Sequence, residues 1–246
     1  LSILPKGKLF DVGCSTGYFM LIAKEKGFDV YGMETSEIAV KIAKEKFGLK
    51  IAQALTFDEL PEEFKGPYKV VTAFEVLEHV EDPLNFLKNI YELLEENGFA
   101  LISTPPYFKF ENTALGYRKY KWWGVDYPPV HLTCWKPWTL FYALKLVGFS
   151  EIIIFTEPLL MGTILEGINP PDVEIKYPDG KNITLPKGTA TAILLDTLKP
   201  FYLNSRILGN FQYAIAVKGK SNYDWEKIIK RSIRYSTVEI IWGKGN

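Results

Sequence analysis

Apolar runs of strand length alternate with amphipathic stretches along residues 1–155 of the chain. The runs are rich in β-branched and aromatic residues, and the stretches between them place apolar residues at helical spacing. This alternation is typical of a parallel sheet whose strands are connected by helices. We therefore expect strands at residues 8–12, 28–33, 49–52, 69–74, 99–103, 151–155 and 213–217.

Capping residues indicate where the helices between these strands begin and end. Asp82 followed by Pro83 is a favourable helix start, because proline is preferred in the first turn. Ser36 can cap the helix after the second strand, and glycine commonly ends a helix. The expected helices run from about Gly17 to Gly27, from Ser36 to Gly48, from Asp82 to Gly98 and from Pro137 to Gly148.

Two segments interrupt this regular alternation. Residues 104–135 are aromatic and proline-bearing, and we expect a lid or substrate loop there, because long loops in compact domains are usually functional or disordered. Residues 156–210 form an insertion before the last strand, in which a Pro-Asp-Gly turn predicts a hairpin and an apolar stretch predicts a helix. We expect residues 1–246 to form a single domain that contains both segments.

Composition and charge narrow the classes of function. The chain carries no formal net charge at pH 7 and no long basic tract, so nothing favours a nucleic-acid channel. The two cysteines form no C-x-x-C pair, so nothing suggests a disulfide framework or a zinc site. Without a run of about 20 apolar residues, we expect a cytoplasmic protein with no integral membrane segment. Because the first strand follows Leu1 almost at once, we also expect that an N-terminal segment is missing.

A glycine-rich turn joins the first strand to the first helix. It reads Asp11-Val-Gly13-Cys-Ser-Thr-Gly17, whereas a dinucleotide-binding turn has the pattern G-x-G-x-x-G with a pyrophosphate at the helix N-terminus. Glycines let the backbone turn tightly and approach a ligand closely. A carboxylate at the end of the strand disfavours a pyrophosphate and suits a cationic ligand. The turn therefore predicts a nucleotide-sized ligand other than NAD, and a strand–helix turn without any ligand is the alternative.

This turn resembles motif I of the Rossmann-like S-adenosylmethionine (SAM)-dependent methyltransferases, in which a third glycine often stands where this chain has Ser15. The resemblance implies an α/β three-layer sandwich whose mostly parallel seven-stranded sheet has an antiparallel last strand. Glu34 ends the second strand, where dinucleotide-binding folds place the acid that binds the ribose. A solvated glutamate at a helix start is the alternative. The resemblance implies SAM contacts from Asp11, Gly13, Cys14, Gly17, Glu34, Thr35, Phe74 and Glu75.

A second group of polar residues follows the fourth strand, at the sheet edge where ligands bind in open α/β folds. Glu75, Glu78 and His79 would share one face if a helical turn began at Glu75. The second histidine, His131, lies in the aromatic loop that must return over this edge. This pattern resembles two groups of methyltransferases, the ubiquinone-pathway O-methyltransferases and the small-RNA 2′-O-methyltransferases.

The resemblance implies two chemical roles for these residues. Glu75, Glu78, His79 and His131 would hold a divalent metal ion beside the accepting hydroxyl, and imidazole suits Mn²⁺, Fe²⁺ or Zn²⁺ better than Mg²⁺. Alternatively, His79 or His131 is the general base that removes the acceptor proton. The remaining interpretation is structural: Glu78 and His79 would cap and stabilise a helix, and His131 would be a structural residue of the loop.

We therefore expect a SAM-dependent methyltransferase that methylates a hydroxyl of a small-molecule or sugar-like acceptor. A non-catalytic SAM-binding partner subunit is an alternative, because Ser15 departs from the glycine-rich motif and the insertion is large. RNA 2′-O-methylation is the other alternative, although the neutral charge weighs against it and no long nucleic acid is expected as a partner. Apolar residues in 156–210 would allow a homodimer.

Overall fold

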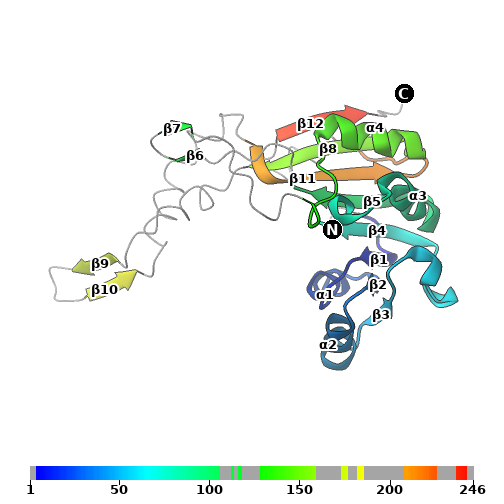
Figure 1. The fold of residues 1–246 in the computed structure, drawn as a ribbon, viewed down its shortest axis with the longest axis horizontal. Coiled ribbons are helices and arrows are strands. Elements are labelled where there is room, and N and C mark those ends of the chain that lie inside the picture. Colours follow the sequence, from blue (N-terminus) through cyan, green and yellow to red (C-terminus); the bar gives the residue numbers. More distant parts are fainter. Residues whose placement is uncertain are drawn as a thin grey trace.

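A mixed sheet of eight strands lies at the centre of the protein (Figure 1). The computed structural model describes residues 4–105, 112–113, 116–117, 128–158, 173–176, 182–185, 208–225 and 237–242. The sheet contains β1 (Lys8–Val12), β2 (Asp29–Glu34), β3 (Lys50–Gln53), β4 (Tyr68–Phe74), β5 (Leu94–Thr104), β8 (Glu151–Pro158), β11 (Leu208–Val217) and β12 (Thr237–Trp242). Their order is β12-β8-β11-β5-β4-β1-β2-β3.

The directions of the strands agree with the predicted fold class. The pairs from β3 across to β5 are parallel, and β11 is antiparallel to both of its neighbours, β5 and β8. β12 pairs antiparallel with β8 and adds an eighth strand that the sequence interpretation did not include. All seven expected strands are present, so the prediction of a mostly parallel sheet with an antiparallel last strand is confirmed.

Helices cover both faces of the sheet (Figure 1). They are α1 (Tyr18–Glu25), α2 (Glu37–Phe47), α3 (Pro83–Leu93) and α4 (Pro137–Val147). Successive strand residues point to opposite faces, so Leu9 packs with the buried residues of α1 and α2, whereas Phe10 packs with those of α3 and α4. The protein is therefore the predicted three-layer α/β sandwich.

The ends of the helices follow their capping residues with one exception. The Ser36 hydroxyl accepts a hydrogen bond from the Ala39 amide at the start of α2, and an Asp82 carboxylate oxygen accepts one from the Asn85 amide at the start of α3. The prediction that α3 extends to Gly98 is wrong, because the chain enters β5 at Leu94. There the Lys218 ammonium donates to the carbonyl of Leu94, and it also donates to a carbonyl in the last turn of α3.

The remaining described elements are short. Three 3₁₀ turns occur at η1 (Phe57–Glu59), η2 (Glu62–Phe64) and η3 (Leu77–His79), and β6 (Asn112–Thr113) pairs with β7 (Gly116–Tyr117). β9 (Val173–Lys176) pairs antiparallel with β10 (Asn182–Leu185). Most of the expected lid at 104–135 and of the insertion at 156–210, including its helix, lies outside the described residues, so the proposed domain organisation stays a prediction. Among the described residues, no helix has the length and apolarity needed to cross a bilayer.

Candidate cofactor and active site

The turn between β1 and α1 is held against the end of β2 by backbone hydrogen bonds. The amides of Gly13 and Cys14 both donate to the Met33 carbonyl, at 2.9 and 3.0 Å. Gly13, Ser15 and Gly17 have positive φ angles of 69°, 48° and 85°. Ser15 therefore adopts the left-handed conformation that glycine usually provides. The departure from the glycine-rich pattern at this position leaves the shape of the turn intact.

A side chain at either glycine of the turn would also crowd a neighbouring residue. A Cβ atom at Gly13 would lie 2.6 Å from Val76 Cγ2, and one at Gly17 would lie 2.3 Å from Leu49 Cδ1. The sequence interpretation missed Gly32, at which a Cβ atom would lie 2.9 Å from the sulfur of Cys14. A glycine inside a strand pattern is the signal that could have found it, because such a residue often marks a close backbone approach.

Glu34, the last residue of β2, connects the end of this strand to the glycine turn after β1. Its Oε2 accepts a hydrogen bond from the Ser15 amide at 2.8 Å, across the turn. Its Oε1 accepts from the amides of Thr35 and Ser36, both at 2.9 Å, and from the Thr35 hydroxyl at 3.2 Å. These donors fix a half-buried carboxylate beside the glycine turn. A carboxylate has about four acceptor positions, so Oε2 retains capacity for a further donor.

Asp11 is the buried acid of the site. Its carboxylate accepts a hydrogen bond from the Thr72 hydroxyl at 2.6 Å, and the residue is 4% exposed. Burial raises the pKa of Asp11 to about 7, the Thr72 bond opposes that rise, and the Glu34 charge adds to it. A bound cation would favour the ionised form. These two carboxylates therefore fit a ligand that donates from a hydroxyl to Glu34 and places a positive charge near Asp11.

The other predicted cofactor residues line the same edge in different ways. Cys14 is buried, and burial, followed by the charges of Asp11 and Glu34, raises the pKa of its thiol. Thr35 is exposed next to Glu34. The Phe74 ring packs edge-to-face on Phe19, with ring centroids 4.9 Å apart. Cys14 is therefore a neutral packing residue at neutral pH rather than a nucleophile.

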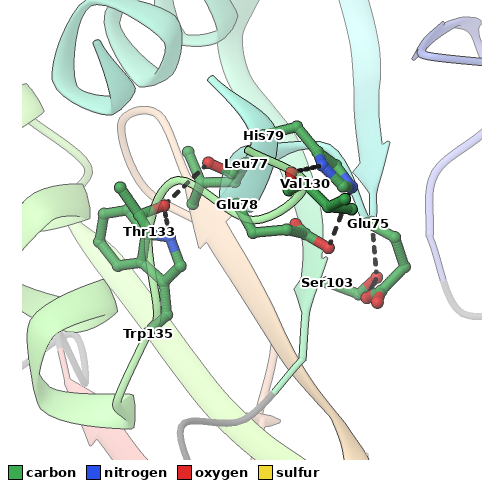
Figure 2. Close-up of polar contacts among 8 residues, drawn as sticks. All are labelled: Glu75, Leu77, Glu78, His79, Ser103, Val130, Thr133 and Trp135. Carbon is green, nitrogen blue, oxygen red and sulfur yellow. Dashed lines mark hydrogen bonds and ion pairs between the residues drawn. The ribbon is translucent and has the colours of Figure 1, made fainter. Parts of the chain in front are cut away.

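Glu78, His79 and His131 form a second cluster, after β4. Each offers one ligand atom, and these atoms lie within 4.8 Å of one another. His79 Nε2 is 3.8 Å from Glu78 Oε1, which is nearly fully buried, and the two imidazole rings meet edge-to-face with centroids 4.9 Å apart. Figure 2 shows the Glu78 carboxylate directed toward the His79 ring. The two histidines lie side by side, as the sequence interpretation expected, and their role in a site stays a prediction.

A backbone carbonyl holds the His79 ring in place. Its Nδ1 lies 2.6 Å from the Val130 carbonyl oxygen (Figure 2). Because a carbonyl oxygen can only accept, Nδ1 carries the hydrogen. In the neutral ring, Nε2 is then the basic nitrogen, and it faces Glu78. This backbone contact is typical of both metal-binding histidines and catalytic bases.

Glu75 is not part of this cluster. The expected helical turn does not begin there, because Glu75 has a left-handed φ of 56° and the 3₁₀ turn starts only at Leu77. Its Oε1 instead accepts a hydrogen bond from the Ser103 hydroxyl at 2.8 Å, and its amide donates to the Ser103 carbonyl (Figure 2). The structure thus brings together three of the four predicted metal ligands and places the fourth against β5.

The fold and the site together define the chain as a class I, Rossmann-like SAM-dependent methyltransferase. The glycine turn follows β1 and the acid stands at the end of β2, at the sheet edge where open α/β folds bind their ligands. The chain belongs to the family described as methyltransferase domain, whose family model matches residues 2–150.

Relatives and solved structures agree with this assignment. The chain is 34% identical over 101 residues to a ubiquinone biosynthesis O-methyltransferase of Bordetella avium. The aligned residues are 39% of this chain and 42% of that protein. A protein with the same name from a Caulobacter species is 35% identical over 101 residues, or 39% of this chain and 40% of that protein. The chain thus spans about two-fifths of the length of these curated relatives.

Solved structures share the fold at lower identity. A SAM-dependent methyltransferase of Archaeoglobus fulgidus superposes with a TM-score of 0.54 at 18% identity, covering 86% of each chain. Phosphoethanolamine N-methyltransferase 2 of Haemonchus contortus, solved in complex with SAM, gives a TM-score of 0.53 at 15% identity, covering 89% of this chain and 50% of the other. At these identities, the likeness concerns the fold.

Proposed function

We propose that this protein transfers the methyl group of SAM to a hydroxyl of a small acceptor. The observation that carries the proposal is the carboxylate of Glu34, held by the Ser15 amide beside the glycine turn. SAM, when bound, supplies a methyl group activated by a sulfonium. Glu34 would accept a hydrogen bond from a ribose hydroxyl on Oε2, which has acceptor capacity left beside the Ser15 amide, and Asp11 would face the cationic amine of the methionine part. The absence of a side chain at Gly13 lets Val76 pack against the turn.

Methyl transfer to a hydroxyl also requires that one proton leaves the acceptor. His79 is the best-supported base, because the Val130 carbonyl holds the hydrogen on Nδ1 and leaves Nε2 to take a proton. The nearby Glu78 carboxylate would stabilise the imidazolium that forms. His131 would orient the base through its edge-to-face contact with the His79 ring.

A divalent metal ion on Glu78, His79 and His131 is the second candidate for activating the hydroxyl. The donor set fits such an ion, since one carboxylate and two imidazoles present their ligand atoms within 4.8 Å of one another. A backbone carbonyl on His79 Nδ1 is the outer-shell partner that metal-binding histidines commonly have. A metal ion there would lower the pKa of the acceptor hydroxyl, and imidazole favours Mn²⁺, Fe²⁺ or Zn²⁺ over Mg²⁺.

The acceptor class rests on the ubiquinone biosynthesis O-methyltransferases among the relatives. A non-catalytic SAM-binding partner subunit and an RNA 2′-O-methyltransferase stay as alternatives, and a homodimer through 156–210 stays a prediction. A panel of phenols, catechols, sugars and short RNAs with radiolabelled SAM would separate them. Label transfer to small hydroxyl compounds supports the proposal, whereas transfer to RNA alone, or SAM binding without any transfer, overturns it.

Calorimetric titration with SAM tests the cofactor site directly. Hydrogen bonds to a charged group contribute about 1.5–3 kcal/mol, so Glu34→Gln should weaken SAM binding by at least about tenfold. Glu37→Gln is the matched control, because Glu37 is exposed in the first turn of α2. Equal affinities of wild type and the Glu34 variant would contradict the ribose role. Tight binding of NAD in place of SAM would overturn the proposed function.

A further inference from the structure

Gln212 carries a fully buried side-chain amide, and it has no role in the function proposed above. It lies on β11 opposite Thr104, where β5 ends at the ligand-binding edge of the sheet. Its Nε2 donates one hydrogen bond to the Thr104 hydroxyl at 2.8 Å and another to the Trp135 carbonyl at 2.9 Å. Trp135 is 77 residues away in the sequence, so this contact joins distant parts of the chain.

The partners of Gln212 determine how its amide is oriented. The Trp135 carbonyl can only accept a hydrogen bond, so the amide nitrogen must face it. Oε1 of Gln212 is then buried and accepts no hydrogen bond within the described residues. A buried acceptor without a donor lowers stability, and an apolar side chain of similar size would avoid that loss. The amide therefore serves the contact with Trp135 better than it serves core packing.

From Trp135, hydrogen bonds continue to the 3₁₀ turn η3. The Trp135 indole donates to the Thr133 hydroxyl at 2.9 Å, and this hydroxyl lies 3.4 Å from the Leu77 carbonyl, to which it donates (Figure 2). The amides of Leu132 and Thr133 both donate to the Glu78 carbonyl, at 2.8 and 3.1 Å. His131 immediately precedes these bonded residues. The segment that carries His131 is thus tied to the sheet at one end and to η3 at the other.

We propose that Gln212 is a positioning residue for His131. By holding the Trp135 carbonyl, it fixes residues 132–135 against η3 and keeps the His131 ring in contact with His79. The value of this contact for methyl transfer rests on the proposed function. The contact between the two rings does not depend on the proposed function, and it can be measured without SAM or an acceptor.

Nuclear magnetic resonance of the untagged protein tests the proposal. The chain has two histidines, so a cross-relaxation signal between protons of different imidazole rings reports the contact between His79 and His131 alone. Gln212→Met keeps the side-chain length and removes the donor, and we expect this signal to be lost. Thr133→Val should also lose it, whereas Thr133→Ser keeps the hydroxyl and should retain it.

Glu151→Gln is the matched control for loss of a buried polar contact. Glu151 begins β8 at the opposite edge, where it accepts hydrogen bonds from the Ser221 amide and the Trp225 indole. This variant should keep the histidine signal even where its thermal stability falls as far as that of Gln212→Met. A signal retained in Gln212→Met, or lost in Glu151→Gln, overturns the proposal. If Gln212→Met does not fold, the comparison of Thr133→Val with Thr133→Ser tests the proposal. The same histidine signal in both Thr133 variants would overturn it.

Discussion

Asp11 is a buried carboxyl whose ionisation makes the stability of this protein depend on pH. Burial raises its pKa from 3.8 to about 7, the Thr72 hydrogen bond partly opposes this, and the Glu34 charge adds to it. Between these values the folded protein holds a proton that the unfolded chain has lost, so folding stability falls as pH rises. Asp11→Asn should remove this dependence, because an amide can still accept the Thr72 hydrogen bond but does not ionise.

The size of the effect follows from the difference between the two pKa values. The stability gained by Asp11→Asn should grow by about 1.4 kcal/mol per pH unit above pH ~4 and level off near pH ~7 at about 4 kcal/mol. Urea unfolding of the ligand-free protein between pH ~4.5 and ~8.5 measures it. Asp58→Asn is the control, because Asp58 is exposed. If wild type and Asp11→Asn showed parallel pH profiles, the reasoning about Asp11 would be refuted.

The same carboxyl couples SAM binding to pH. A cation beside Asp11 favours its ionised form, so SAM binding below about pH 7 should release a proton and become tighter as pH rises toward that value. Calorimetry in buffers of different ionisation enthalpy measures the released proton. Asp11→Asn should abolish the release, and no release from wild type would contradict the placement of the amine at Asp11.

The turn itself offers two further predictions. Ser15→Gly removes a side chain from a left-handed residue, and urea unfolding should show a stability gain of up to about 1 kcal/mol with SAM affinity retained. A loss of stability would show that the Ser15 side chain makes a contact worth more than the strain. Gly13→Ala should cost more than Gly27→Ala, by about 1–3 kcal/mol of overpacking, because both have left-handed backbones but only Gly13 is crowded by Val76. Equal costs would remove the steric argument.

Residues at strand ends could be predicted because their positions follow from local pattern. Asp11 and Glu34 each end an apolar run, and neighbouring parallel strands bring such residues to one edge. Glu75 was misplaced, since spacing alone gave no sign that its backbone turns left-handed and its side chain bonds to Ser103. The raised pKa of Asp11, about 7, could not be predicted from the sequence either, because it is caused mainly by burial.

Contacts between distant segments could not be predicted from one sequence. Gln212 and Trp135 meet only because β11 inserts between β5 and β8, and no local motif marks either residue. The eighth strand, β12, is different, because its run of β-branched and aromatic residues is typical of a strand and was simply not assigned. Long-range register is therefore what the sequence interpretation lacked.

A crystal structure with S-adenosylhomocysteine bound tests the central claim most directly. The account predicts a ribose hydroxyl on Oε2 of Glu34, the amine near Asp11 and the backbone of the glycine turn against the ligand. It also predicts that the sulfur faces the side of the edge that carries His79 and His131. Binding elsewhere on the protein, or no binding at a concentration that saturates other methyltransferases, would contradict the account.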